Sequence, residues 1–127
     1  MTTAHLDTHV VVWLAAALVG ALSRDARRAI ERAEVIEISP MVVYELEVLH
    51  ELGRLDRPPS AILGPLTERV GLAVSPLGFQ AVVERAASLE WTREPCDRLI
   101  TAQAEVAGAR LVTKDRSIRA HSAAALW

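Results

Sequence analysis

Four acidic residues stand where their carboxylates could meet in the folded chain. Asp7, Asp97 and Asp115 each lie at a junction where one predicted element ends and a helix begins, and Glu45 lies within the apolar stripe of a predicted helix. Carboxylates gathered in one place repel each other and raise each other's pKa unless a cation or a proton compensates them. If these four converge, they predict a divalent-metal site able to hydrolyse phosphodiesters.

Helical geometry separates Glu45 from the acids next to it in the sequence. At about 100° per residue, Glu45 shares a face with Met41 and Leu49, whereas Glu47 and Glu51 fall on the opposite, solvated face. A carboxylate on an apolar face is costly to bury unless it is paired or coordinates a metal. A salt bridge to an arginine, or a helix end that overhangs the core, would also explain its position.

The three aspartates have a simpler explanation when each is taken alone. Aspartate is a favoured helix N-cap, because its carboxylate accepts hydrogen bonds from exposed amides and interacts favourably with the helix dipole. Asp7, Asp97 and Asp115 could each be a cap and nothing more. Their joint occurrence with Glu45 favours the metal-site interpretation.

The elements that must position these acids alternate between strand and helix. Strands are predicted at residues 4–6, 35–38, 72–74 and 110–112, and helices at residues 8–18, 23–33, 40–53, 60–70, 79–88 and 97–107, with a short helix after Asp115. This alternation indicates an α/β fold with a parallel sheet and helices on both faces. Ligands of such sheets bind beyond the carboxyl ends of the strands, where Asp7 and Asp115 are expected.

Composition limits the class of protein. The 127 residues are most simply one domain, and the net charge of -2 excludes a generally basic nucleic-acid binder. The thirteen arginines against one lysine suit phosphate binding, although a GC-rich genome would produce the same bias. The single cysteine, Cys96, allows no intrachain disulfide, so a reducing compartment is expected. The apolar run at residues 10–22 is too short to span a bilayer, and we expect a cytoplasmic protein.

Four segments of the chain resemble the successive motifs of PIN-domain ribonucleases and, more narrowly, of the VapC toxins of bacterial type II toxin–antitoxin pairs. They are Leu6-Asp7-Thr8-His9 with Trp13-Leu14, Val43-Tyr44-Glu45-Leu46 with Gly53-Arg54-Leu55, Glu94-Pro95-Cys96-Asp97-Arg98 with the helix after it, and Leu111-Val112-Thr113-Lys114-Asp115. The resemblance covers nearly the whole chain in order. One departure is visible, because the family often has aspartate where this chain has Glu94.

The resemblance implies one PIN domain over residues 1–127, a three-layer α/β/α fold with a short, mainly parallel central sheet flanked by helices. It implies that Asp7, Glu45, Asp97 and Asp115 are the catalytic quartet. These residues would bind Mg²⁺, for which Mn²⁺ would substitute, and orient the water that hydrolyses an RNA phosphodiester bond. Thr113 would lie beside the site and hold a carboxylate or a metal-bound water.

The resemblance also implies partners. It predicts an RNA substrate, a homodimer, and a cognate VapB-like antitoxin whose C-terminal segment blocks the active site. No membrane partner is expected.

Basic and aromatic residues supply further candidates. Arg98 could contact a substrate phosphate or brace the acidic cluster, and Lys114, Arg116 and Arg119 near the last motif could hold an RNA backbone. Surface solvation is the alternative for the last three residues, for Arg110, and for the arginines of the second helix. His5 and His9 lack zinc-ligand spacing and are expected to pack in the core or at its rim. The three tryptophans are expected to pack, although an exposed one could stack on a base.

Other functions fit the sequence less well. A non-catalytic PIN-like RNA- or protein-binding module would not need all four acids. A phosphorelay receiver would need an acidic pair near its first strand, where Asp7 stands alone. A phosphatase of the haloacid-dehalogenase type would need a second aspartate at position 9, which is histidine.

Overall fold

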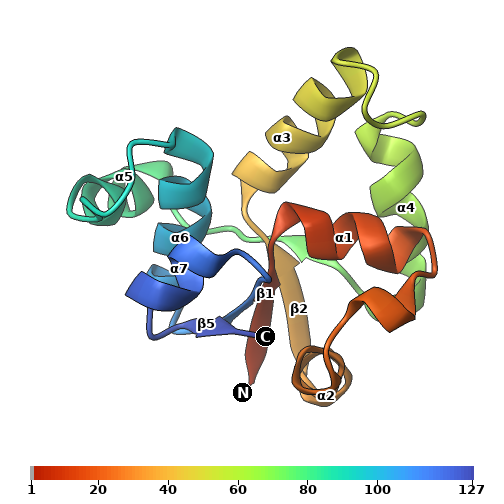
Figure 1. Ribbon diagram of the computed structural model, residues 1–127, viewed down its shortest axis with the longest axis horizontal. Helices are drawn as coiled ribbons and strands as arrows, with labels where there is room; N and C mark the ends of the chain where they lie inside the picture. Colours follow the sequence, from red (N-terminus) through yellow and green to blue (C-terminus); the bar gives the residue numbers. More distant parts are fainter. Residues whose placement is uncertain (1) are drawn as a thin grey trace.

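The computed structural model describes residues 2–127, which form an α/β fold around a parallel sheet. The sheet has five strands in the order β3-β2-β1-β4-β5, and every neighbouring pair is parallel. Helices cover both of its faces, with α1, α2 and α4 on one side and α5 and α6 on the other (Figure 1). The predicted three-layer α/β/α architecture is therefore confirmed.

The bounds of the elements follow the alternation predicted from sequence. The strands are β1 (Thr3–Leu6), β2 (Val35–Ile38), β3 (Ala73–Val74), β4 (Arg110–Val112) and β5 (Ala125–Leu126). The helices are α1 (Thr8–Ala15), α2 (Arg24–Arg32), α3 (Pro40–Glu51), α4 (Pro59–Val70), α5 (Phe79–Ala87), α6 (Pro95–Ala107) and α7 (Arg116–His121), with a 3₁₀ turn, η1, at Val19–Ala21.

The strand order reverses direction beside β1, and this reversal creates a binding position. From β1 the chain builds outward through β2 to β3, then returns to place β4 on the other side of β1. The connections that leave β1 and β4 run to opposite sides of the sheet (Figure 1), and this divergence leaves a crevice at the carboxyl ends of the two strands. Leu6 ends β1 opposite Val112 of β4, so the residues that follow both strands open into one crevice.

Aliphatic side chains from the sheet and the helices form the hydrophobic core, which fixes the positions of the ends of β1 and β4. Val10 and Val11 of α1, Ile100 of α6 and Leu111 of β4 are each at most 1% exposed. A core of small branched residues lets helices approach a sheet closely, because interdigitated side chains leave few voids. The strand ends that carry the acids are thus attached to a rigid layer.

Most predicted boundaries lie within a residue or two of the observed ones, and three differences change the course of the chain. The first helix ends at Ala15 rather than residue 18, because Ala17 takes a positive φ of 58° and the chain turns into η1. The helix expected from Asp97 begins two residues earlier, at Pro95. The C-terminal stretch, for which no element was predicted, adds β5 to the edge of the sheet by pairing with β4.

None of the helices within residues 2–127 is long and apolar enough to cross a membrane.

Candidate active site

Asp7 is the most firmly held of the four predicted acids. It follows β1, caps α1 and is 4% exposed. The Thr8 amide donates to its Oδ1 at 2.8 Å, and the Thr113 hydroxyl donates to its Oδ2 at 2.6 Å. Both carboxylate oxygens therefore have a fixed donor, which sets the orientation of the group.

Thr113 joins the ends of the two central strands. Its side chain is fully buried, and its Oγ1 accepts a hydrogen bond at 3.0 Å from the Asp115 amide while it donates to Asp7. Asp115 then caps α7, because its Oδ1 accepts from the Ile118 amide at 2.9 Å. One hydroxyl thus fixes the spacing between two acidic residues that are far apart in sequence.

Glu45 reaches the same place from α3. Its side chain is half-buried, and it accepts a hydrogen bond from the Thr8 hydroxyl. Desolvation raises the pKa of Glu45; the Thr8 hydrogen bond opposes this shift, and the charges of Asp7 and Glu94 add to it. In the described part of the chain no arginine pairs with Glu45, so the salt-bridge alternative was wrong.

The predicted faces of α3 need one correction. Glu51 is exposed as expected, but Glu47 is half-buried, and Leu52, placed on the apolar stripe, is 63% exposed. The reason is that α3 projects away from the sheet at its C-terminal end (Figure 1). Glu45 therefore lies between the core and the projecting part, at the rim of the crevice.

Asp97 is not a helix cap, which corrects the simplest sequence interpretation. Glu94 is the N-cap of α6, and the Asp97 amide donates to its Oε2 at 2.6 Å. No donor within residues 2–127 reaches the carboxylate of Asp97 itself. Desolvation raises its pKa to about 7, with further contributions from the negative charges of Glu94, Asp115, Asp7 and Glu45.

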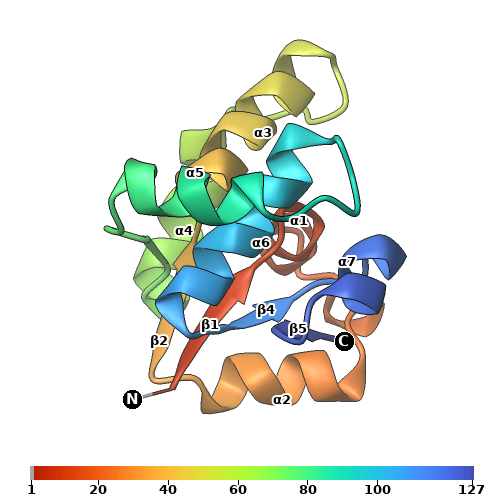
Figure 2. The ribbon, with the colours of Figure 1, turned by 90° about the vertical axis from the view of Figure 1, so that its left-hand side faces the viewer.

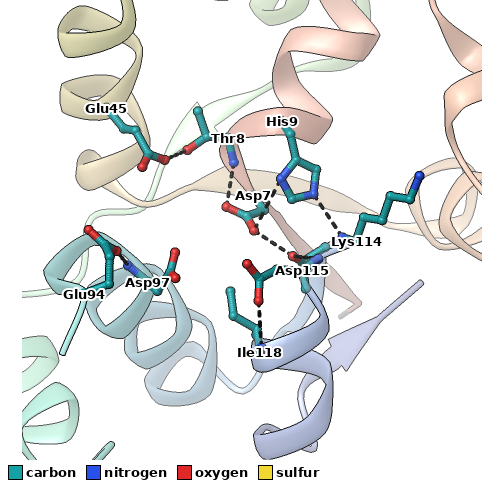
Figure 3. A network of polar contacts seen from close by, with 10 residues as sticks. Asp7, Thr8, His9, Glu45, Glu94, Asp97, Lys114, Asp115 and Ile118 are labelled. Atoms are coloured by element: carbon teal, nitrogen blue, oxygen red, sulfur yellow. Dashed lines mark hydrogen bonds and ion pairs between the residues drawn. The ribbon is translucent and has the colours of Figure 1, made fainter. Parts of the chain in front are cut away.

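The four acids line one open cleft of about 340 Å³. Their carboxylates come from the ends of β1 and β4 and from α3 and α6, and Figure 3 shows them arranged around a common space. Among the described residues no lysine or arginine forms an ion pair with any of the four. A cluster of hard oxygen donors that no lysine or arginine neutralises is the environment that a divalent cation such as Mg²⁺ prefers.

The spacing of the acids limits how an ion could be held. Within residues 2–127 no group of three or more acidic, histidine or cysteine side chains is close enough to ligate one ion together. Magnesium commonly keeps several waters and takes only one or two carboxylates directly. The arrangement suits that mode rather than an all-protein cage.

Comparison with known proteins identifies the fold. The PIN-domain family matches residues 4–123. The chain belongs to the PIN-domain family. It is 37% identical over 124 residues to "Ribonuclease VapC22" of Mycobacterium tuberculosis, covering 95% of this chain and 93% of the relative. This level of identity over nearly both whole lengths places it in the VapC group of PIN domains, as the sequence motifs predicted.

Solved structures share the fold of this PIN domain at low sequence identity. A toxin–antitoxin complex from Klebsiella pneumoniae has a TM-score of 0.65 and 19% identity, covering 98% of this chain and 96% of that one. VapBC2 from Rickettsia felis, solved with a DNA fragment from its promoter, has a TM-score of 0.61 and 18% identity, covering 94% and 93%. A protein from Pyrobaculum aerophilum has a TM-score of 0.65 and 23% identity, covering 98% and 88%.

The basic residues predicted from sequence separate into two groups in this PIN domain. Arg98 points away from the acids, because its Nε donates to the Thr92 carbonyl at 2.7 Å and it lines a different pocket between α5 and α6. It braces the loop before α6, not the acidic cluster. Lys114, Arg116 and Arg119 are exposed beside Asp115, where they are free to meet a polyanion.

Sequence reasoning missed three contributors to the cleft. Thr8 holds both Asp7 and Glu45. His9, half-buried at the rim as expected, accepts a hydrogen bond at its Nε2 from the Lys114 amide at 2.9 Å and places its Nδ1 3.7 Å from Asp7 Oδ2. Arg54, in the connection between α3 and α4, also lines the cleft. Thr8 and His9 adjoin Asp7 in sequence, which was the available signal.

Proposed function

We propose that this VapC-group PIN domain is an endoribonuclease and the toxin of a type II toxin–antitoxin pair. It would hydrolyse RNA phosphodiester bonds with a divalent cation, Mg²⁺ or Mn²⁺. The observation that carries the proposal is the cleft lined by Asp7, Glu45, Asp97 and Asp115, none of which forms an ion pair with a lysine or arginine within the described residues. The 37% identity to a protein named ribonuclease VapC22 supports the same activity.

The residues present fit such a cation. The raised pKa values of Asp97 and Glu45 indicate that the acids cannot all ionise near neutral pH without a compensating positive charge. When bound, a divalent cation supplies that charge, polarises water and neutralises charge on phosphate oxygens. Asp7, Glu45, Asp97 and Asp115 would hold it.

The side chains around the cleft would have different roles in the reaction. Thr8 and Thr113 donate to both oxygens of Asp7 and keep that carboxylate in one orientation. Asp97 has no protein donor on its carboxylate among residues 2–127, so it is available to orient the attacking water and to accept its proton. These positions are set before RNA arrives, so little reorganisation is needed when it binds.

Exposed cations at the cleft would hold the RNA backbone. Arg54 lines the cleft, and Lys114, Arg116 and Arg119 lie beside Asp115. Phosphate contacts of this kind supply affinity without reading sequence, and they weaken as salt rises. A chain of net charge -2 would therefore bind RNA through this one basic rim.

An antitoxin would close the site. An apolar groove along α1, lined by Val12, Ala15, Ala16 and the α3–α4 connection, adjoins the acidic cleft, and both are lined by Val12 and Leu55. We propose that a VapB-like antitoxin lays its C-terminal segment along this groove and so covers the acids. Two of the structurally similar proteins are toxin–antitoxin assemblies, which supports a partner of this class.

We also propose a homodimer. Tyr44 on α3 and Phe79 at the start of α5 are 61% and 67% exposed, although both are large and apolar. A second copy covering them would remove this surface from water. Size-exclusion chromatography with light scattering checks the stoichiometry.

Removing acids tests the enzyme against the alternative of a non-catalytic PIN-like RNA- or protein-binding module. We expect Asp97→Asn and Glu45→Gln to lower RNA cleavage in Mn²⁺ at least a hundredfold and to abolish growth arrest. Glu51→Gln, on the exposed side of the same helix as Glu45, is the matched control and should retain both activities. Cleavage and toxicity that survive both acidic-site changes would support the binding module.

A further inference from the structure

Trp13 shares the cleft with the four acids. It projects from α1, is half-buried and lines the same cavity as Asp7, Glu45, Asp97 and Asp115. Part of the indole packs against the hydrophobic core. The part that lines the acidic cleft presents apolar surface to whatever enters it.

Two neighbouring rings fix the orientation of this indole. The His9 ring lies 5.0 Å from that of Trp13 between centroids, and the Trp127 ring lies 5.8 Å away, both tilted by 54°. His9 and Trp127 in turn meet edge to face at 6.5 Å. Tilted and edge-to-face contacts at these distances are favourable, so the three rings form one rigid group.

A cation already lies over the Trp13 ring. Lys114 Nζ is 5.8 Å from the ring centroid, which is within cation–π range. Lys114 is exposed, so its ammonium can leave the ring at little cost. The position over the ring is therefore open to another flat group, and the displaced ammonium would stay within reach of a neighbouring phosphate.

Hydrogen bonds tie the aromatic group to the acids. His9 Nε2 accepts from the Lys114 amide, and Lys114 stands between Thr113 and Asp115. His9 Nδ1 faces Asp7 Oδ2 at 3.7 Å, and Nε2, which accepts from the Lys114 amide, lies on the other side of the ring (Figure 3). A group stacked on Trp13 would thus be held at a set distance from the acidic residues.

We infer that Trp13 is a specificity-determining residue, on which an unpaired base beside the scissile phosphate stacks. Every base has a π-face, so stacking tolerates any sequence but requires a base whose face is free. Bases inside a duplex are covered by their neighbours, so the preferred substrate would be a single-stranded or looped RNA. This inference rests on the proposed ribonuclease function.

Binding to two probes separates stacking from backbone contact. The probes are a dodecamer of oligoadenylate and a dodecamer of the same length without bases, measured with the Asp97→Asn protein so that cleavage does not interfere. We expect a further Trp13→Leu change to weaken oligoadenylate binding about tenfold and to leave abasic binding unchanged. Trp13→Phe, which keeps an aromatic face, should recover most of the loss.

Trp91 provides the matched control. It stacks flat on His121 at 5.2 Å and lies outside the cleft, so Trp91→Phe should bind both probes normally. Equal oligoadenylate binding by the Trp13→Leu protein and its parent would overturn the stacking inference while leaving the ribonuclease function intact. Failure of the parent to bind either probe, with no cleavage by the wild-type protein, would overturn both.

Discussion

Thr113 acts on the candidate site through Asp7, whose carboxylate it orients. The Thr113 hydroxyl is fully buried, donates to Asp7 and accepts from the Asp115 amide. Groups that orient metal-binding carboxylates typically change metal affinity or activity ten- to a hundredfold when removed. We therefore propose that Thr113 is a positioning residue.

Thr113→Val keeps the shape of the side chain and removes only its hydroxyl. We expect RNA cleavage to fall about ten- to a hundredfold and the free energy of unfolding to fall by about 1–3 kcal/mol, because the Asp115 amide and Asp7 each lose a partner. Steady-state cleavage at several Mn²⁺ concentrations and urea denaturation measure the two effects. Thr113→Ser, which restores the hydroxyl, should recover activity; a Val variant with normal metal dependence would contradict this role.

Sequence reasoning predicted which acidic residues share a site, because their motifs could be read locally. It did not predict where the Arg98 side chain points, because that depends on the packing of the folded chain. The grouping of Asp7, Glu45, Asp97 and Asp115 followed from their motifs, and the structure places all four in one cleft. Arg98 follows Asp97 directly, yet the turn of the helix points it to the Thr92 carbonyl instead. Adjacency along a helix says little about shared contacts, because consecutive residues face different sides.

Among the elements, the position at which α6 begins determines whether the Asp97 carboxylate caps the helix or faces the cleft. Glu94 supplies the cap, so Asp97 is released from capping and its carboxylate is free to face the cleft. Only Asp97 was considered as a cap from the sequence, and Pro95 in the first helical turn is what favours the earlier start. The edge strand β5 was missed because two residues carry no readable alternation.

A mutation in the apolar groove beside α1 should weaken antitoxin binding without affecting RNA cleavage. Ala16 is exposed, ends α1 and lines the apolar groove but not the acidic cleft. We expect Ala16→Arg to weaken antitoxin binding at least tenfold, because a bulky charge must be desolvated in an apolar contact. Cleavage by the free protein should be unchanged. Isothermal titration with the co-encoded antitoxin measures the affinity.

Ala81 offers the comparison for that experiment. It is an exposed alanine on α5, across the sheet from α1, so Ala81→Arg adds the same charge without touching the groove. The two variants should differ in antitoxin affinity and agree in thermal stability. Equal affinities would place the antitoxin somewhere else on the molecule.

For the whole molecule, the repulsion among the acids of the cleft is a source of instability that a bound cation would relieve. The pKa of Asp97 is raised on folding to about 7 from an ordinary value of 3.8. A carboxyl of this kind stabilises the fold fully below its unfolded pKa, and that contribution is lost as pH rises through 7. Without metal, the protein should therefore become less stable between pH 4 and pH 8.

Thermal melts in EDTA and in Mn²⁺ test this directly. In EDTA at pH 8 we expect Asp97→Asn to be more stable than the wild-type chain by on the order of 1 kcal/mol after solvent screening, and the difference should vanish near pH 4. Saturating Mn²⁺ should raise the Tm of the wild-type chain and have less effect on the variant. A melting temperature indifferent to both pH and Mn²⁺ would contradict the metal site.

The hydrogen bond between Thr113 and Asp7 joins residues 106 positions apart, and its range has a consequence for synthesis. Asp7 leaves the ribosome 106 residues before Thr113, which follows the strand that completes the crevice. Partly made chains lack Thr113 and Asp115 and so cannot assemble the cleft. The acidic cleft therefore cannot form until the segment that carries Thr113 and Asp115 has emerged, and during that interval the growing chain would be inactive.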